Sequence, residues 1–131
     1  MTKLSFINPA GVTVPKGYTQ VVSAESQARI IYISGQVAID EKGENVGKGN
    51  LEAQTRQVYT NLAAILKSQG ASFKDVVKLN TYCTEPEKVD VVRKVRNEFV
   101  VLESPPASTF IGVTALADPA YLVEIEAVAI V

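Results

Sequence analysis

Glu124 and Glu126 are the residues whose type and spacing best suit acid–base chemistry. They lie two positions apart in an alternating, strand-like segment, so both side chains are expected on one face of a strand. Two carboxylates on one face can share general acid and base roles. Such glutamates also form salt bridges at an interface or at the rim of a sheet, and spacing alone favours that structural role.

Three other groups carry weaker signals. Cys83 would need a neighbouring lysine or arginine to become a nucleophile, and a small, partly buried apolar role is favoured. Arg93 and Arg96 are spaced i, i+3 in a predicted helix, which is typical of a solvated helix face. The Gly-Lys-Gly segment at 47–49 lacks the third glycine of a phosphate-binding motif, so it is interpreted as a flexible loop.

Two further segments place polar groups next to loops. Tyr18 follows Gly17, and Gly35 lies between Ser34 and Gln36 at the end of a predicted strand. A glycine at that point permits close approach of a ligand to the backbone, but it equally suits a turn. Spacing does not decide between the two.

The composition excludes several classes of function. The 131 residues are 47% hydrophobic and 21% charged, which predicts one folded domain over residues 1–131. The net charge is −1 with no basic run, so neither nucleic acid nor a membrane surface is an expected partner. The chain has no histidine, which argues against Ser-His-Asp or Cys-His catalysis and against a histidine-ligated metal.

The expected location is the cytoplasm. Cys83 is the single cysteine and cannot form an internal disulfide. No stretch approaches the roughly 20 apolar residues that span a bilayer, and the N-terminal residues lack the apolar run of a secretory signal.

Hydrophobic periodicity predicts an α+β fold with two helices on one face of a sheet. Asn50 is the expected cap of the first helix, and Gly70 the expected terminator. The second helix is expected to open at Pro86, to end before Pro105 and to bury a stripe that includes Leu102. The predicted elements are strands at 4–7, 18–22 and 29–37, a helix at 50–69, a strand at 76–84, the second helix, and strands at 107–116 and 121–131.

The last strand has two different faces. One face is apolar and suits packing under helices; the other mixes glutamates with Leu122, Val128 and Ile130. That second face is too apolar for water and too charged for a plain core. We therefore expect it to be covered by oligomerisation.

Across nearly its whole length the sequence resembles the RidA (YjgF) family of small reactive-intermediate deaminases. Together the landmarks are specific, although any one alone would be weak. They are Gly17-Tyr18-Thr19-Gln20, Ile33-Ser34-Gly35-Gln36, the helix from Gln54 to Leu66, Val76-Val77-Lys78, Pro106-Ala107-Ser108-Thr109, Leu116-Ala117-Asp118-Pro119 and Leu122-Val123-Glu124-Ile125-Glu126-Ala127.

The resemblance implies a chorismate-mutase-like fold, in which a mixed β-sheet carries two helices on one face. Family members form homotrimers whose sheets build a central barrel, with a cleft for a small molecule between each pair of subunits. The active members hydrolyse imines and enamines such as 2-aminoacrylate to 2-keto acids and ammonia, without cofactor or metal. Carried over by motif, Tyr18, Gly35 and Thr109 would bind the substrate, and Glu124 would position or activate the attacking water.

The departure from the family lies at Ser108. Active deaminases have an arginine there, which forks onto the substrate carboxylate. A neutral serine in its place should cost several kcal/mol, or a factor of about 100 or more. Efficient deamination of 2-aminoacrylate is therefore not expected. One hypothesis restores the contact. Arg93 aligns loosely with a position of the second helix that faces the neighbouring subunit's cleft in the deaminases, so it would bind the carboxylate from the adjacent chain.

Two functions remain open. The first is an imine or enamine deaminase, a hydrolase, with an altered substrate range. The second is a non-catalytic homotrimer that binds a ligand or a protein partner in the same cleft. Serine at position 108 favours the non-catalytic homotrimer, whereas retention of Tyr18, Gly35 and Glu124 argues mildly for the deaminase.

Overall fold

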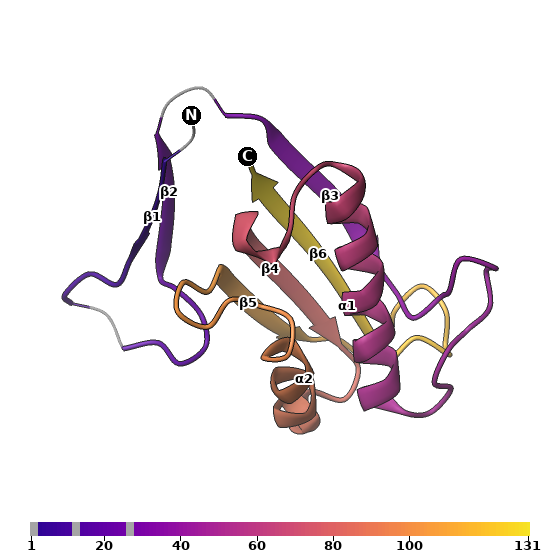
Figure 1. Cartoon of the computed structure of the whole chain (residues 1–131). Helices are drawn as coiled ribbons and strands as arrows, with labels where there is room; N and C mark the ends of the chain where they lie inside the picture. Colours follow the sequence, from indigo (N-terminus) through magenta and orange to yellow (C-terminus); the bar gives the residue numbers. More distant parts are fainter. Residues whose placement is uncertain (1–2, 12–13, 26–27) are drawn as a thin grey trace.

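A four-stranded mixed sheet forms the centre of the structure, and both α-helices pack on one of its faces (Figure 1). The computed structural model describes residues 3–11, 14–25 and 28–131. The strands follow the order β3-β6-β4-β5, and β1 and β2 form a separate two-stranded sheet. The elements are β1 (Lys3–Ile7), β2 (Val21–Glu25), β3 (Ile30–Gln36), α1 (Leu51–Ser68), β4 (Val76–Cys83), α2 (Val89–Arg96), β5 (Ala107–Gly112) and β6 (Val123–Ile130), with 3-10 turns at Phe73–Asp75 and Pro86–Lys88.

The strand directions follow from the connections. β6 runs antiparallel to both of its neighbours, β3 and β4. β4 and β5 are parallel, and α2 lies in the crossover between them, as a parallel pair requires. The expected α+β architecture, with two helices on one face of a mixed sheet, is confirmed.

α1 forms where the apolar stripe predicted it. The Asn50 side chain accepts a hydrogen bond from the backbone N–H of Ala53 at 3.0 Å, which caps the first turn. Gly70 has φ of +70°, the left-handed conformation that commonly ends helices. The buried face of α1, including Val58, Leu62 and Leu66, packs over the sheet.

The alternation of β6 is also as expected. Val123, Ile125, Ala127 and Ala129 are buried under the helices, whereas the residues between them are only partly covered. We call the side of the four-stranded sheet opposite the helices the open face. On β3, the same face exposes 79% of Tyr32 and 51% of Ile30.

Three predicted boundaries are wrong. The second strand lies at Val21–Glu25, not 18–22, because Gly17 has φ of +76° and Thr19 bonds to the segment before β5. The last strand but one ends at Gly112 rather than 116, where Gly112 lies against the Pro86 ring.

The third error concerns the second helix, which ends at Arg96. The next residues form a turn in which the N–H groups of Phe99 and Val100 both bond to the Arg96 carbonyl. This turn buries Val100 and leaves Leu102 49% exposed, so Leu102 does not belong to the buried stripe. The β-branched pair at 100 and 101 and the prolines that follow favour this exit from the helix.

A buried side-chain amide on α1 fixes the backbone just before β6 by hydrogen bonds. The Gln54 side chain donates to the Ala120 carbonyl at 2.8 Å and accepts from the Leu122 N–H at 2.9 Å. Only 2% of Gln54 is exposed, so these backbone groups have little access to water. The loop before β6 therefore depends on one side chain for its hydrogen bonds.

We expect Gln54→Ala to lower the free energy of unfolding by about 1–3 kcal/mol, because it leaves buried backbone groups unpaired. Urea denaturation followed by circular dichroism measures the change. Gln57→Ala on the same helix is the matched control, since among the described residues the Gln57 side chain bonds only to the Asn61 side chain. Equal losses in the two variants would contradict this account of Gln54.

Candidate functional site

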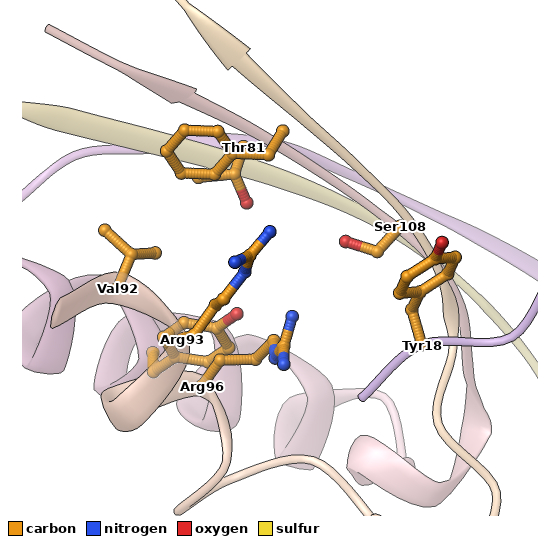
Figure 2. Close-up of a pocket in the computed structure, with 8 residues that line it drawn as sticks. Tyr18, Thr81, Val92, Arg93, Arg96 and Ser108 are labelled. Carbon is orange, nitrogen blue, oxygen red and sulfur yellow. The ribbon is translucent and has the colours of Figure 1, made fainter. Parts of the chain in front are cut away.

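The family-derived site residues fall on two different surfaces of the subunit. Gly35 and Glu124 lie together on the open face. Tyr18, Arg93 and Ser108 lie together on the helix side, at the β5 edge of the sheet (Figure 2). Strand alternation turns Thr109 away from Ser108 to the open face, where β5 is separated from β6 by β4 and the Thr109 hydroxyl accepts a hydrogen bond from Lys78 Nζ at 2.7 Å. One subunit therefore does not bring all six residues into one cavity.

The open-face group is built by close contact between β3 and β6. A Cβ placed on Gly35 would lie 2.2 Å from the Glu124 Oε1. Only glycine lets the carboxylate rest against this strand. The β3–β6 register is irregular between Ile33 and Gln36, which is where the strand presents Gly35. This bulge is the kind of local feature that re-aims groups at sites.

Glu126 has a structural partner. The Tyr82 hydroxyl donates to Glu126 Oε1 at 2.7 Å, and this bond raises the pKa of Tyr82 above its usual value. Glu124 contributes to the same rise more weakly through its charge. The two glutamates thus share a strand face, as predicted, but Glu126 is bound to a tyrosine whereas Glu124 faces Gly35.

The second group lines a cavity of about 210 Å³ that we call the arginine pocket. It lies between α1, α2, the edge of the sheet and the segment before β2. None of its lining residues is acidic. They are Tyr18, Tyr59, Thr81, Val92, Arg93, Arg96, Ser108 and Phe110.

Tyr18 reaches the pocket because its neighbour is tied to the start of β5. The Thr19 N–H donates to the Pro106 carbonyl at 3.0 Å, and the Thr19 hydroxyl donates to the Pro105 carbonyl. Thr19 is only 2% exposed. These bonds hold Tyr18 beside Ser108, although the two residues are far apart in the sequence.

Arg96 is a site residue that the sequence prediction missed. Instead of lying on a solvated helix face, it is half-buried and lines the pocket. Its i, i+3 spacing from Arg93 already indicated that both lie on one side of the helix, but not that this side faces a cavity. Burial lowers the pKa of Arg96, and this effect exceeds the opposing influence of Tyr59, which raises the pKa; repulsion from Arg93 lowers it by less than either.

Tyr59 and Thr81 are the other missed residues. Tyr59 lies on the buried face of α1 and stacks on Phe99 with ring centroids 5.2 Å apart. Tyr59 also lines the pocket, and burial raises the pKa of its hydroxyl while the Arg96 charge opposes that rise. Thr81 faces the helices on β4 by simple alternation with Leu79 and Cys83.

Cys83 is fully buried, and burial raises the pKa of its thiol. A thiol that resists ionisation is a poor nucleophile, in keeping with the apolar role predicted for it. Within residues 3–11, 14–25 and 28–131, no group of three or more histidine, cysteine, aspartate or glutamate side chains is placed to hold a metal ion. No helix in those same ranges is both long enough and apolar enough to cross a membrane.

Comparison with known proteins agrees with this fold. Residues 11–131 match the family described as endoribonuclease L-PSP. A RutC family protein of Pyrococcus horikoshii is 36% identical over 86% of this chain and 85% of its own length. A 2-iminobutanoate/2-iminopropanoate deaminase of Dermatophagoides farinae is 30% identical over 87% of this chain and 85% of its own.

A solved structure is also similar over nearly the whole chain. It is a Rid family protein of unknown function from Yersinia pestis, with a TM-score of 0.85 and 38% identity over 98% of both chains. These matches cover far more than half of the sequence. The chain belongs to the endoribonuclease L-PSP family, which includes the RidA (YjgF) and RutC proteins.

The contact between Gly35 and Glu124 gives a geometric prediction. In Gly35→Ala the new Cβ must force the Glu124 carboxylate to move by about 1 Å to reach an ordinary van der Waals distance. A crystal structure of the variant measures the shift. Ser34→Ala, one residue away, adds no atom and should leave the carboxylate in place. An unmoved Glu124 in Gly35→Ala would contradict the contact.

Proposed function

We propose that this protein is an imine or enamine deaminase that uses Arg93, rather than an arginine at the position of Ser108, to bind the substrate carboxylate. The supporting observation is that Arg93 lines the same pocket as Ser108 and Tyr18. Figure 2 shows its guanidinium extended toward Thr81 and Ser108. A fork of guanidinium donors close to Ser108 can replace the charge-assisted contact that serine itself does not supply.

The proposal requires assembly with other copies of the chain, for which the resemblance to the family implies a homotrimer. The pocket residues and the pair Gly35 and Glu124 lie on opposite sides of the sheet, so one subunit would contribute the arginine pocket and its neighbour the glutamate. The exposed Tyr32 and Ile30 on the open face support burial of that face against other copies. Each of the three clefts would then hold one small metabolite in a cytoplasmic protein.

The chemistry is hydrolysis of a carbon–nitrogen double bond. Glu124 accepts a proton from a water molecule as the water oxygen bonds to the imine carbon. Glu124 passes this proton to the nitrogen, which gives a carbinolamine, and then moves the hydroxyl proton to the same nitrogen. The C–N bond breaks, ammonia leaves, and the water oxygen remains as the keto oxygen. Arg93 holds the carboxylate next to the reacting carbon, so the imine is presented to the water in one orientation.

The relatives support the reaction class. The protein of Dermatophagoides farinae and one from Homo sapiens are named 2-iminobutanoate/2-iminopropanoate deaminases, and one from Acinetobacter baylyi is named a 3-aminoacrylate deaminase. A binding protein without catalysis is the second candidate, favoured by the neutral side chain of Ser108. The two differ in whether keto acid is released.

The first experiment measures ammonia and keto-acid release from freshly generated amino-acid imines, with an arginine-containing deaminase as positive control. We expect turnover that falls by about 100-fold or more in Glu124→Gln, because the variant lacks the base. Glu103→Gln, an exposed carboxylate outside both groups, is the matched control and should keep full activity. If no imine in the panel releases ammonia or keto acid, the deaminase hypothesis is rejected and the non-catalytic binding protein is favoured.

A second prediction tests the carboxylate contact. We expect Arg93→Ala to lower kcat/KM by about 100-fold, the effect of losing a charge-assisted hydrogen-bonded pair. Arg93→Lys keeps the charge without the fork and should recover part of the loss. Lys94→Ala is the control on the outer side of α2, where Lys94 pairs with Glu52 at 3.3 Å. Unchanged kinetics in Arg93→Ala would remove Arg93 from the site.

A further inference from the structure

The arginine pocket carries more positive charge than one carboxylate needs. Arg93 pairs with Asp90 at 3.6 Å, but the Asp90 side chain is 95% exposed, so water screens most of that attraction. Among the described residues, Arg96 has no carboxylate within ion-pair distance, and its Nε donates only to the Asn97 side chain at 3.1 Å. The pocket thus holds two guanidinium groups with little neutralisation.

The Arg96 guanidinium occupies space that the glycine at position 17 leaves free. A Cβ on Gly17 would lie 2.2 Å from the Arg96 Nη2 and 3.1 Å from its Cζ, so the guanidinium fits only because position 17 has no side chain. The left-handed φ of Gly17 suits glycine for a second reason. Arg96 is therefore packed against the loop that carries Tyr18 and is not fully exposed to solvent.

The two guanidinium groups serve different ends of the space. Figure 2 shows Arg93 extended toward Thr81 and Ser108, whereas Arg96 extends toward Tyr18. A second hollow of about 500 Å³ adjoins the pocket and shares Tyr18, Arg93 and Arg96 with it. Its other lining residues include Lys16 and Asn97 but no acid. The two adjoining hollows, of about 210 and 500 Å³, leave room for a ligand with two anionic groups.

Electrostatics favours filling both positions. Arg96 is partly desolvated and repelled by Arg93, and each effect lowers its pKa. Arginine nevertheless stays protonated near neutral pH. The Arg93 side chain is 53% exposed, so water screens part of the repulsion, whereas Arg96 is half-buried and gains more from a counter-charge. A ligand with one negative group neutralises only one of the two cations.

We infer that the arginine pocket selects small dicarboxylates, with one carboxylate on Arg93 and the second on Arg96. The inference rests on the proposed function in one respect: the preferred substrate becomes the imine of a dicarboxylic amino acid. Arg96 is then the residue that determines specificity, and Gly17 is its positioning residue. The hydroxyls of Tyr18 and Ser108 provide further hydrogen bonds along the same ligand.

The test compares ligands of equal length by isothermal titration calorimetry on the assembled protein. Succinate and butyrate have four carbons each and differ in one carboxylate. We expect succinate to bind the unmodified protein about 10- to 100-fold more tightly than butyrate, the worth of one charge-assisted contact. Equal affinities would overturn the inference. Inorganic phosphate, which carries its charge on one group, should bind more weakly than succinate, and tighter phosphate binding would also overturn it.

Variants identify the residue responsible. Arg96→Gln should remove most of the preference for succinate over butyrate, a ratio that loss of stability alone would not change. Gly17→Ala should act in the same direction by displacing the guanidinium, which keeps the test decisive if Arg96→Gln folds poorly. Lys94→Gln, on the other side of α2, should keep the full preference. A preference that survives both Arg96→Gln and Gly17→Ala would refute the role of Arg96.

The binding test is independent of turnover. If the protein prefers succinate but hydrolyses no imine, the dicarboxylate pocket stands and the proposed enzyme fails. If it hydrolyses only monocarboxylic imines and binds succinate no better than butyrate, the enzyme stands and the dicarboxylate inference fails.

Discussion

The register of β6 is the constraint on which the rest of the structure depends. β6 lies between β3 and β4, and its alternate residues are buried beneath the helices. A shift of one residue would turn Glu124 into the apolar core and expose Ile125 to the opposite face. Burial of an unpaired carboxylate costs several kcal/mol, so a shifted register is strongly disfavoured and Glu124 stays on the open face. The Gln54 amide strengthens this at the strand entry, where it bonds to the backbone on either side of Tyr121.

A second constraint acts at the other edge of the sheet. The bonds from Thr19 to Pro105 and Pro106 bring the segment before β2 against the start of β5. Ser108 and Tyr18 become neighbours as a result, and Arg96 lies under the same loop. The two constraints place the glutamate and the arginines on opposite faces of one subunit. On the proposed function, assembly rather than folding completes the cleft.

Periodicity was sufficient to predict the elements that bury regular stripes. α1, with its Asn50 cap and Gly70 terminator, and the two faces of β6 follow from spacing alone. The errors lie where tertiary contacts override local pattern. Leu102 fits the helical stripe by spacing, yet the chain leaves the helix at Arg96 and buries Val100 instead.

The candidate site also divides into residues that the sequence indicated and residues that only tertiary contacts reveal. A resemblance in short motifs pointed to Tyr18, Arg93 and Ser108, which do share a pocket. It also pointed to Thr109, which faces away from that pocket and bonds to Lys78. Arg96 escaped prediction because nothing in a single sequence indicates that a glycine 79 positions earlier leaves room for its guanidinium. Such packing across long sequence separations becomes visible only in three dimensions.

The position of β6 also governs how the chain folds during synthesis. The strand at the centre of the sheet is the last of the elements along the sequence, and Ile31 pairs with Ala129, about 100 residues later. A ribosome therefore releases β3, β4 and β5 before the strand that joins β3 to the other two exists. Non-local pairings of this kind are formed late and slowly, since loop closure precedes any gain from the contacts. Until then, the nascent chain carries unpaired strand edges, the feature that exposes a folding chain to aggregation.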